Sequence, residues 1–538
     1  MPLDTLVTGR IGTFAGDSGY GWVEAIGITG GKVAFAGSAI DLETRADPHT
    51  RRFELEPGEI AIPGLTDAHL HFGDGAIAAT QVDLTPAQSL GDGLALLVAA
   101  AGRLRPDEWL LGAGWDQRRW GRWPTADDLE DALPGRAAVL WSFDHHAIWV
   151  SHTALSAASL DRESVDPAGG IIRRTSNGSP EGVLLENAVP LVTTRIARPS
   201  DESIERAIVA FGDDLLSYGV VGVHDPAPVS PGDPLGPLEL YGRMADRGDL
   251  PIRVHSCIRS NGIEPAIARG WSSGKLLGED PLGIARMGWL KLFGDGTLGS
   301  QTAALLEPRE GSDDLGVFRT TPAELAALAS RAADGGIATQ IHAIGDAAVR
   351  AAIDALAPTT SRVAFMPRLE HVQLCHPDDR PRFAALGIAA SVQPVHIRED
   401  AATARRDWGD RAEAWGYTYR TFLDAGAVLA FGTDAPVEPI DPWPGIALAV
   451  LRRDPSWGPD AAPFGPHEAL TLEEALRANS VAPATTIRDP FGGRLIPGSP
   501  GDLIVLPAAP KEPDAQAAAF AAVRPRLVLV GGEAVVER

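Results

Sequence analysis

The segment AIPGLTDAHLHF, residues 61–72, carries the strongest fold signal in the chain. It reads as an apolar strand with a Pro-Gly turn that ends in His69 and His71. Residues two apart on a strand point to the same side, so both imidazoles can reach one metal ion. A His-x-His pair alone is more often structural than functional. At the end of a strand, however, it fits the catalytic face of a (β/α)8 barrel.

Four further strand-like segments end near a residue that can bind metal. They supply, in chain order, Lys291 in GWLKLFGDG, His342 in ATQIHAIGD, His371 in RLEHVQL and Asp434 in AGAVLAFGTDAP. A lone His after an apolar strand is usually a core residue, and an Asp before Ala-Pro usually caps a turn. Their order on successive strands favours one shared site, because imidazole and carboxylate together suit Zn²⁺ and its neighbours.

Lys291 is one of only four lysines among 47 cationic residues. A coding preference for arginine explains the scarcity without any function. A protonated amine is a poor metal ligand, but carboxylation by CO₂ would turn it into a carbamate able to bridge two metals. Asp434 would orient the water that the metal activates, accept its proton and pass it to the leaving group.

Strands alternate with helices over the middle of the chain, which predicts an α/β fold with a (β/α)8 TIM-type barrel over residues 61–489. Capping boxes predict two helix starts, one at Thr321 and Glu324 and the other at Thr471 and Glu474.

Both chain ends differ from this middle part. Residues 1–60 and 490–538 read as short strands separated by glycine turns, so we expect one composite β-sandwich domain built from both termini. Residues 73–135 fit the alternation poorly and contain several tryptophans and prolines. We expect them to form an insertion over the barrel mouth.

The composition narrows the range of partners. A net charge of −24 disfavours nucleic acid and anionic membranes, and two cysteines exclude a disulfide framework. The N-terminus lacks the basic and apolar regions of a signal peptide. We therefore expect a cytoplasmic protein with a small-molecule substrate and no nucleic-acid or membrane partner. A homodimer is one of the assembly states left open.

The ordered ligand set resembles the amidohydrolase superfamily, and longer strings resemble its amidohydrolase family 3 branch, the YtcJ-like proteins. These strings lie between about residues 61 and 480: PGLTDAHLHF, KLFGDGTLGSQTA, IHAIGDAAV, RLEHVQ, SVQPVHIREDAATARRDWGDRAEAWGYTYRTFLDAGA and FGTDAPVEPIDPWPGIALAV. The resemblance implies one or two divalent metals per chain, with zinc as the first choice of metal and carboxylated Lys291 as the bridging ligand. It implies as metal-site residues His69, His71, Lys291, His342, His371 and Asp434.

The resemblance also implies that His146, within DHHAIWVSH, contacts substrate, although His145 stands where the family commonly has Gly. Trp115 and Gln117 are further substrate-binding candidates from the expected insertion. Tryptophans spaced as they are in this segment can equally serve to pack it.

Other residues are weaker candidates. Arg368 and Glu370 precede His371 and are expected to support metal ligands. His224 and His396 follow apolar strands and are weaker pocket residues.

The function expected is metal-dependent hydrolysis of amide or formamide C–N bonds in a small, non-peptide molecule. A deaminase on the same scaffold is the enzyme alternative, and Lys291 counts against it because the deaminases of this superfamily usually lack that residue. A non-catalytic scaffold protein is the third hypothesis. It would be expected to lose ligands, yet all six are present, and fold alone does not decide between these functions.

Overall fold

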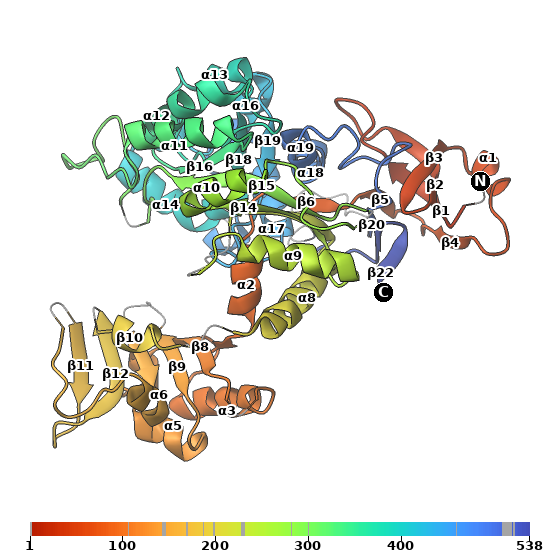
Figure 1. Cartoon of the computed structure of the whole chain (residues 1–538). Coiled ribbons are helices and arrows are strands. Elements are labelled where there is room, and N and C mark those ends of the chain that lie inside the picture. The colour runs from red at the N-terminus through yellow and green to blue at the C-terminus, as the bar shows by residue number, and fades with distance from the viewer. Residues whose placement is uncertain are drawn as a thin grey trace. The chain divides into compact units, whose positions relative to one another are not determined.

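The computed structural model describes residues 3–105, 107–142, 147–167, 170–186, 188–196, 199–227, 232–280, 282–299, 301–458, 460–507, 519 and 522–538. Contacts divide the chain into two compact units. The larger comprises Met1–Gly75 and Ile208–Arg538, and the smaller comprises Ala76–Ala207. Each has its own sheets and buried core (Figure 1).

The larger unit contains a parallel eight-stranded sheet, which confirms the predicted barrel (Figure 1). Its strands follow one another in chain order: β6 (Leu65–Asp67), β13 (Val220–Asp225), β14 (Arg253–Ile258), β15 (Ala285–Phe293), β16 (Thr339–Ala343), β17 (Arg368–His371), β18 (Ala389–Val392) and β19 (Leu429–Phe431). Ala68 N donates to Phe431 O, and Asp434 N donates to His69 O. These bonds connect the first and last strands, so the carboxyl ends of all eight strands form one rim.

Helices follow the barrel strands, as a (β/α)8 pattern requires. They include α9 (Gly236–Arg247), α10 (Ile263–Ala268), α11 (Pro322–Asp334), α12 (Asp346–Leu356), α13 (Arg380–Leu386), α14 (Ile397–Trp408), α17 (Trp443–Leu451) and α18 (Leu472–Ala478). Both predicted capping boxes are confirmed. Thr321 and Glu324 begin α11, and Thr471 and Glu474 begin α18.

A second sheet of the larger unit joins strands from both chain ends. Its order is β22-β21-β20-β5-β1-β2-β3, with β4 on β1. The strands are β1 (Thr5–Gly12), β2 (Trp22–Thr29), β3 (Lys32–Gly37), β4 (Arg51–Glu54), β5 (Ile60–Pro63), β20 (Leu503–Leu506), β21 (Leu527–Val530) and β22 (Glu533–Glu537). Ile26 and Ile28 of β2 share one buried core with Leu527 and Leu529 of β21. The sheet therefore folds over on itself in the manner of a sandwich.

The smaller unit is built on a six-stranded sheet of order β11-β12-β10-β9-β8-β7. Its strands are β7 (Val82–Asp83), β8 (Leu110–Trp115), β9 (Ala138–Ser142), β10 (Ala147–Val150), β11 (Gly170–Arg174) and β12 (Pro180–Glu186), and its helices include α3 (Leu90–Ala101), α5 (Ala126–Ala132) and α6 (His152–Ala157). Because β9 to β12 join this sheet, the unit extends well beyond the 73–135 segment expected as an insertion.

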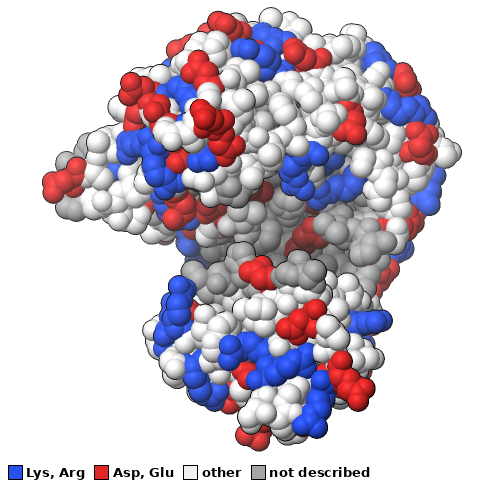
Figure 2. Space-filling model, turned by 90° about the vertical axis from the view of Figure 1, so that its left-hand side faces the viewer, with Lys and Arg blue, Asp and Glu red and all other residues white. Residues whose placement is uncertain are grey.

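None of the described helices is long and apolar enough to cross a membrane. On the face drawn in Figure 2, basic side chains lie in small groups with acidic side chains close by. This mixture fits a chain with 71 acidic and 47 basic residues.

Candidate metal centre

The predicted metal-site residues all lie at the rim formed by the carboxyl ends of the barrel strands. His69 and His71 follow β6, and Lys291 and His342 lie near the ends of β15 and β16. His371 is the last residue of β17, and Asp434 follows β19 after a short turn. Active sites of barrel enzymes form at this end of the strands.

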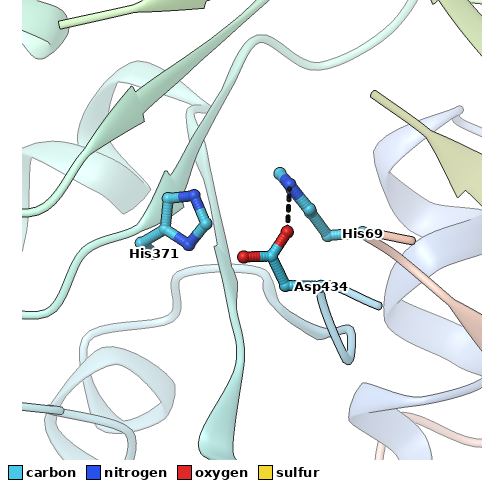
Figure 3. Close-up of side chains that lie close together, drawn as sticks. All are labelled: His69, His371 and Asp434. Carbon is cyan, nitrogen blue, oxygen red and sulfur yellow. Dashed lines mark ion pairs between the residues drawn. The ribbon is translucent and has the colours of Figure 1, made fainter. Parts of the chain in front are cut away.

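Three of these residues converge most closely. His69, His371 and Asp434 each offer one ligand atom, and these atoms lie within 4.8 Å of one another (Figure 3). Asp434 Oδ1 lies 3.4 Å from Nε2 of His69 and 3.4 Å from Nε2 of His71. The rings of His342 and His371 meet edge-on, with centroids 4.4 Å apart. Four imidazoles and one carboxylate thus form a cluster of nitrogen and oxygen donors.

The Lys291 side chain is buried near this cluster. It is 2% exposed, and Nζ has no hydrogen-bond partner among the described residues. Burial lowers the pKa of the amine to about 8, against the opposing effect of the Glu370 and Asp434 carboxylates. A buried polar group without a partner is costly, so a further group that binds this amine fits the site.

Side-chain oxygens orient two of the candidate histidine ligands. His69 Nδ1 lies 2.5 Å from Glu370 Oε2, and His371 Nδ1 lies 2.8 Å from Gln393 Oε1. An acceptor behind Nδ1 keeps the proton there, which leaves Nε2 free to bind a metal. The sequence suggested Glu370 as such a partner. Gln393 was missed, because its role depends on the pairing of β17 with β18.

A buried network holds the strand ends that carry His69 and Asp434. The Asp67 carboxylate accepts hydrogen bonds from the backbone N–H groups of His69 and Thr433 and from the Thr433 hydroxyl. Asp434 adopts φ 64°, in the left-handed region that few non-glycine residues occupy. Burial alone would raise the pKa of Asp434, but its histidine contacts bring it well below its usual value.

His396 and Glu438 extend the site on the far side of Asp434. His396 Nε2 lies 3.4 Å from Asp434 Oδ2, and Nδ1 lies 3.5 Å from Glu438 Oε1. Arg398 pairs with Glu438 at 2.7 Å. Burial would lower the pKa of His396, but the two carboxylates raise it to about 10. His396 was only a weaker candidate from the sequence, and Glu438, four residues after Asp434, was not singled out.

Arg368 is a buried support beneath the candidate ligands. Its Nε pairs with Glu370 Oε1 at 2.7 Å, and its Nη2 donates to Ala68 O at 2.8 Å. Nη1 lies 2.8 Å from Nδ1 of His224. Burial and the charge of Arg368 hold the pKa of His224 well below its usual value. His224 is therefore a neutral acceptor for Arg368, which favours a structural role in holding that guanidinium.

The substrate-binding candidates lie in the smaller unit. Trp115 is fully buried, and its indole N–H donates to Leu140 O at 2.7 Å. Its ring packs near Trp123, with centroids 5.9 Å apart. This burial favours the packing alternative for Trp115. Gln117 begins the short helix α4 (Gln117–Trp120) and is half-buried. His146 lies outside the described residues.

A sequence model of the amidohydrolase family matches residues 57–536. The chain belongs to the amidohydrolase family. It is 29% identical to YtcJ of Bacillus subtilis (strain 168) over 90% of this chain and 91% of that protein. It is 26% identical to an N-substituted formamide deformylase of Arthrobacter pascens over 90% of each chain.

A solved structure of a metal-dependent hydrolase shares the fold. The crystal structure of an uncharacterized metal-dependent hydrolase from Pyrococcus furiosus aligns with a TM-score of 0.76 and 25% identity. The alignment covers 93% of this chain and 98% of that one. Membership of this family and a cluster of imidazole and carboxylate donors both fit a divalent metal at the barrel rim.

Proposed function

We propose that this amidohydrolase cleaves amide or formamide C–N bonds of small, non-peptide molecules with the help of a divalent metal. Zn²⁺ is the metal that we propose first. The observation that carries the proposal is the convergence of His69, His371 and Asp434 beside the Lys291 amine, which has no hydrogen-bond partner among the described residues. The similarity to a formamide deformylase supports the choice of bond.

The residues of the chain have separate roles in this proposal. His69, His71, His342, His371 and Asp434 would hold the metal. When bound, the metal lowers the pKa of a water molecule and polarises the scissile carbonyl. Asp434 is ionised at neutral pH because its pKa lies well below the usual value. It can therefore accept a proton from the attacking water and return it to the leaving nitrogen.

Lys291 would act as a bridging ligand after carboxylation. Its neutral amine would attack CO₂, form an N–C bond and release one proton, which leaves an anionic carbamate. Burial favours the neutral amine that this reaction needs. The carbamate would also remove the cost of a buried amine that has no partner.

Asp434→Asn tests the hydrolytic role directly. The amide keeps the size of the side chain and one weak oxygen ligand but cannot act as a base. We expect much of the metal to remain and turnover to fall by about 10²- to 10⁴-fold. Metal content is measured by mass spectrometry, and turnover on a panel of N-acyl amino acids, formamides and small cyclic amides.

The products separate the alternatives. Release of a carboxylic acid together with an amine supports amide hydrolysis, and formate supports deformylation. Ammonia formed without a new carboxylate would favour the deaminase. Near wild-type turnover in the metal-loaded Asp434→Asn variant would contradict the role proposed for Asp434.

A further inference from the structure

Two arginines lie close to one aromatic ring at the barrel rim. Arg259 directly follows β14, Phe293 ends β15, and Arg319 lies between β15 and α11. The guanidinium carbons of Arg259 and Arg319 lie 5.0 and 4.7 Å from the centroid of the Phe293 ring. Both cations therefore contact the same side chain, within the range of cation–π attraction. We call Arg259 and Arg319 the arginine pair.

Phe293 connects the arginine pair to the candidate metal centre. The centroid of its ring lies 5.6 Å from that of His342 and 5.1 Å from Lys291 Nζ. Phe293 and Lys291 are two residues apart on β15, so their side chains point to the same side of the strand. The arginine pair is thus one aromatic ring away from the proposed ligands, within reach of a small molecule bound at the metal.

Neither arginine of the pair forms an ion pair within the part of the chain that the structure describes. Arg259 donates through Nε and Nη2 to Ala227 O, at 3.1 and 2.8 Å, so Nη1 can still bind a ligand. The Arg319 side chain is exposed and contacts the Phe293 ring.

This arrangement costs free energy in the absence of a ligand. Desolvation is the largest effect on Arg259 and lowers its pKa, against the opposing charges of Asp74 and Asp225. The like charge of Arg319 lowers the pKa of Arg259 further. A carboxylate bound to the arginine pair would relieve the repulsion. The planar guanidinium matches the two oxygens of a carboxylate.

We infer that Arg259 and Arg319 bind a carboxylate of the substrate, so that the amide cleaved at the metal centre belongs to an acidic molecule of the N-acyl amino acid class. The inference rests on the proposed function. It adds that the same small molecule carries a carboxylate on the Phe293 side of the scissile amide. Neutral amides and simple formamides would lack this contact.

The test compares each N-acyl amino acid of a panel with its neutral carboxamide, for example N-acetylalanine with N-acetylalaninamide. Equilibrium binding is measured by calorimetry on the metal-loaded Asp434→Asn protein, with and without Arg319→Gln. We expect at least one acid to bind more tightly than its carboxamide. Arg319→Gln should weaken the binding of that acid by about 10- to 100-fold and leave the binding of the carboxamide unchanged.

Two further variants control for charge and fold. Arg331, on α11, is an exposed arginine paired with Glu264, so Arg331→Gln makes the same charge change away from Phe293. It should leave binding of both probes unchanged. Arg319→Lys keeps the charge but loses the planar fork, and an intermediate affinity is expected. In the metal-loaded enzyme that retains Asp434, Arg319→Gln should raise KM for the acid with little change in kcat.

The outcomes are distinguishable from failure of the proposed function. Binding is measured without turnover, so a protein that binds the acids but hydrolyses none of them contradicts the hydrolase proposal alone. The inference is overturned if no acid of the panel binds more tightly than its carboxamide. It is also overturned if Arg319→Gln weakens the binding of the acid and of the carboxamide equally, or changes the binding of neither.

Discussion

Single atoms set the geometry of the candidate metal centre. Oxygens of Glu370 and Gln393 lie behind the Nδ1 atoms of His69 and His371, so each Nε2 faces the site. The backbone of His371 has φ 74°, a conformation that is costly for a residue with a side chain. Such strain persists where the surroundings determine the conformation. The ligand positions therefore depend on neighbouring strands as much as on the ligands themselves.

Lys291→Ala tests the bridging ligand proposed here. If a carbamate on Lys291 joins two metals, the substitution removes the bridge. We expect the metal content to fall from about two ions per chain to about one or fewer, and turnover to fall with it. Metal content is measured by mass spectrometry. The carbamate is sought as a carbon resonance in protein exposed to isotopically labelled bicarbonate.

Lys275→Ala is the matched control, because Lys275 is another of the four lysines and is exposed. It should keep both the metal content and the carbamate signal. A wild-type protein with one metal per chain, unchanged by Lys291→Ala, would contradict the binuclear site.

The convergence of the candidate ligands at one rim could be predicted at this scale, because each of them lies in or just after an apolar strand near its carboxyl end. Gln393, His396 and Glu438 could not be ranked in the same way. His371 and Gln393 are brought together by the neighbouring strands β17 and β18, and His396 meets Asp434 through loops after β18 and β19. Such contacts depend on strand neighbours and loop direction, which a single sequence does not specify.

Among the elements, the loop after β15 is tied to the end of β16 by one buried carboxylate. Asp295 accepts backbone hydrogen bonds from Ala304, Ile344 and Gly345, at 2.9, 3.0 and 2.9 Å. It also lies 3.6 Å from Nε2 of His342. The capping box of α11 was predictable because its partners are three residues apart. Asp295 was not, because its partners are up to 50 residues away.

Asp295→Ala should destabilise this junction. The substitution leaves three buried N–H groups without an acceptor, and an unsatisfied buried group costs about 1–3 kcal/mol. We expect the free energy of unfolding to fall by at least about 3 kcal/mol, with a lower thermal midpoint measured by circular dichroism. Metal affinity should also fall, because the loop and strand end beside Lys291 and His342 lose their connection.

Asp314→Ala provides the comparison. Asp314 accepts one backbone hydrogen bond, from Gly316, and its side chain is 47% exposed. Water can replace that acceptor, so we expect a loss within about 0.5–1 kcal/mol. Equal losses in the two variants would show that the buried hydrogen bonds of Asp295 contribute no special stability.

On the scale of the whole molecule, both chain ends belong to one sheet. β20 lies between β5 and β21, and Asp502 beside it pairs with Arg253 of the barrel at 2.6 Å. The strand-rich composition of both ends is typical of such a sheet, whereas the order in which the strands pair cannot be read from the sequence. The extent of the smaller unit was underestimated, because short apolar runs such as β9 and β10 do not reveal which sheet they join.

Deletion of residues 500–538 should therefore prevent the protein from folding to a soluble form. Leu503, Val505, Leu527 and Leu529 are fully buried in the core of this sheet. Burial of each contributes roughly 1.5–3 kcal/mol, so together they rival the roughly 5–15 kcal/mol that stabilises a whole domain. The deletion would also leave β5 as an unpaired edge beside an apolar face, which favours aggregation.

Removal of residues 533–538 alone takes away β22, an edge strand whose side chains are mostly exposed. That shorter deletion should leave a soluble, metal-binding protein with a lower thermal midpoint. The soluble fraction, the elution volume and the metal content are compared for the two deletions. A soluble and fully active protein lacking residues 500–538 would show that the barrel does not need the shared sheet.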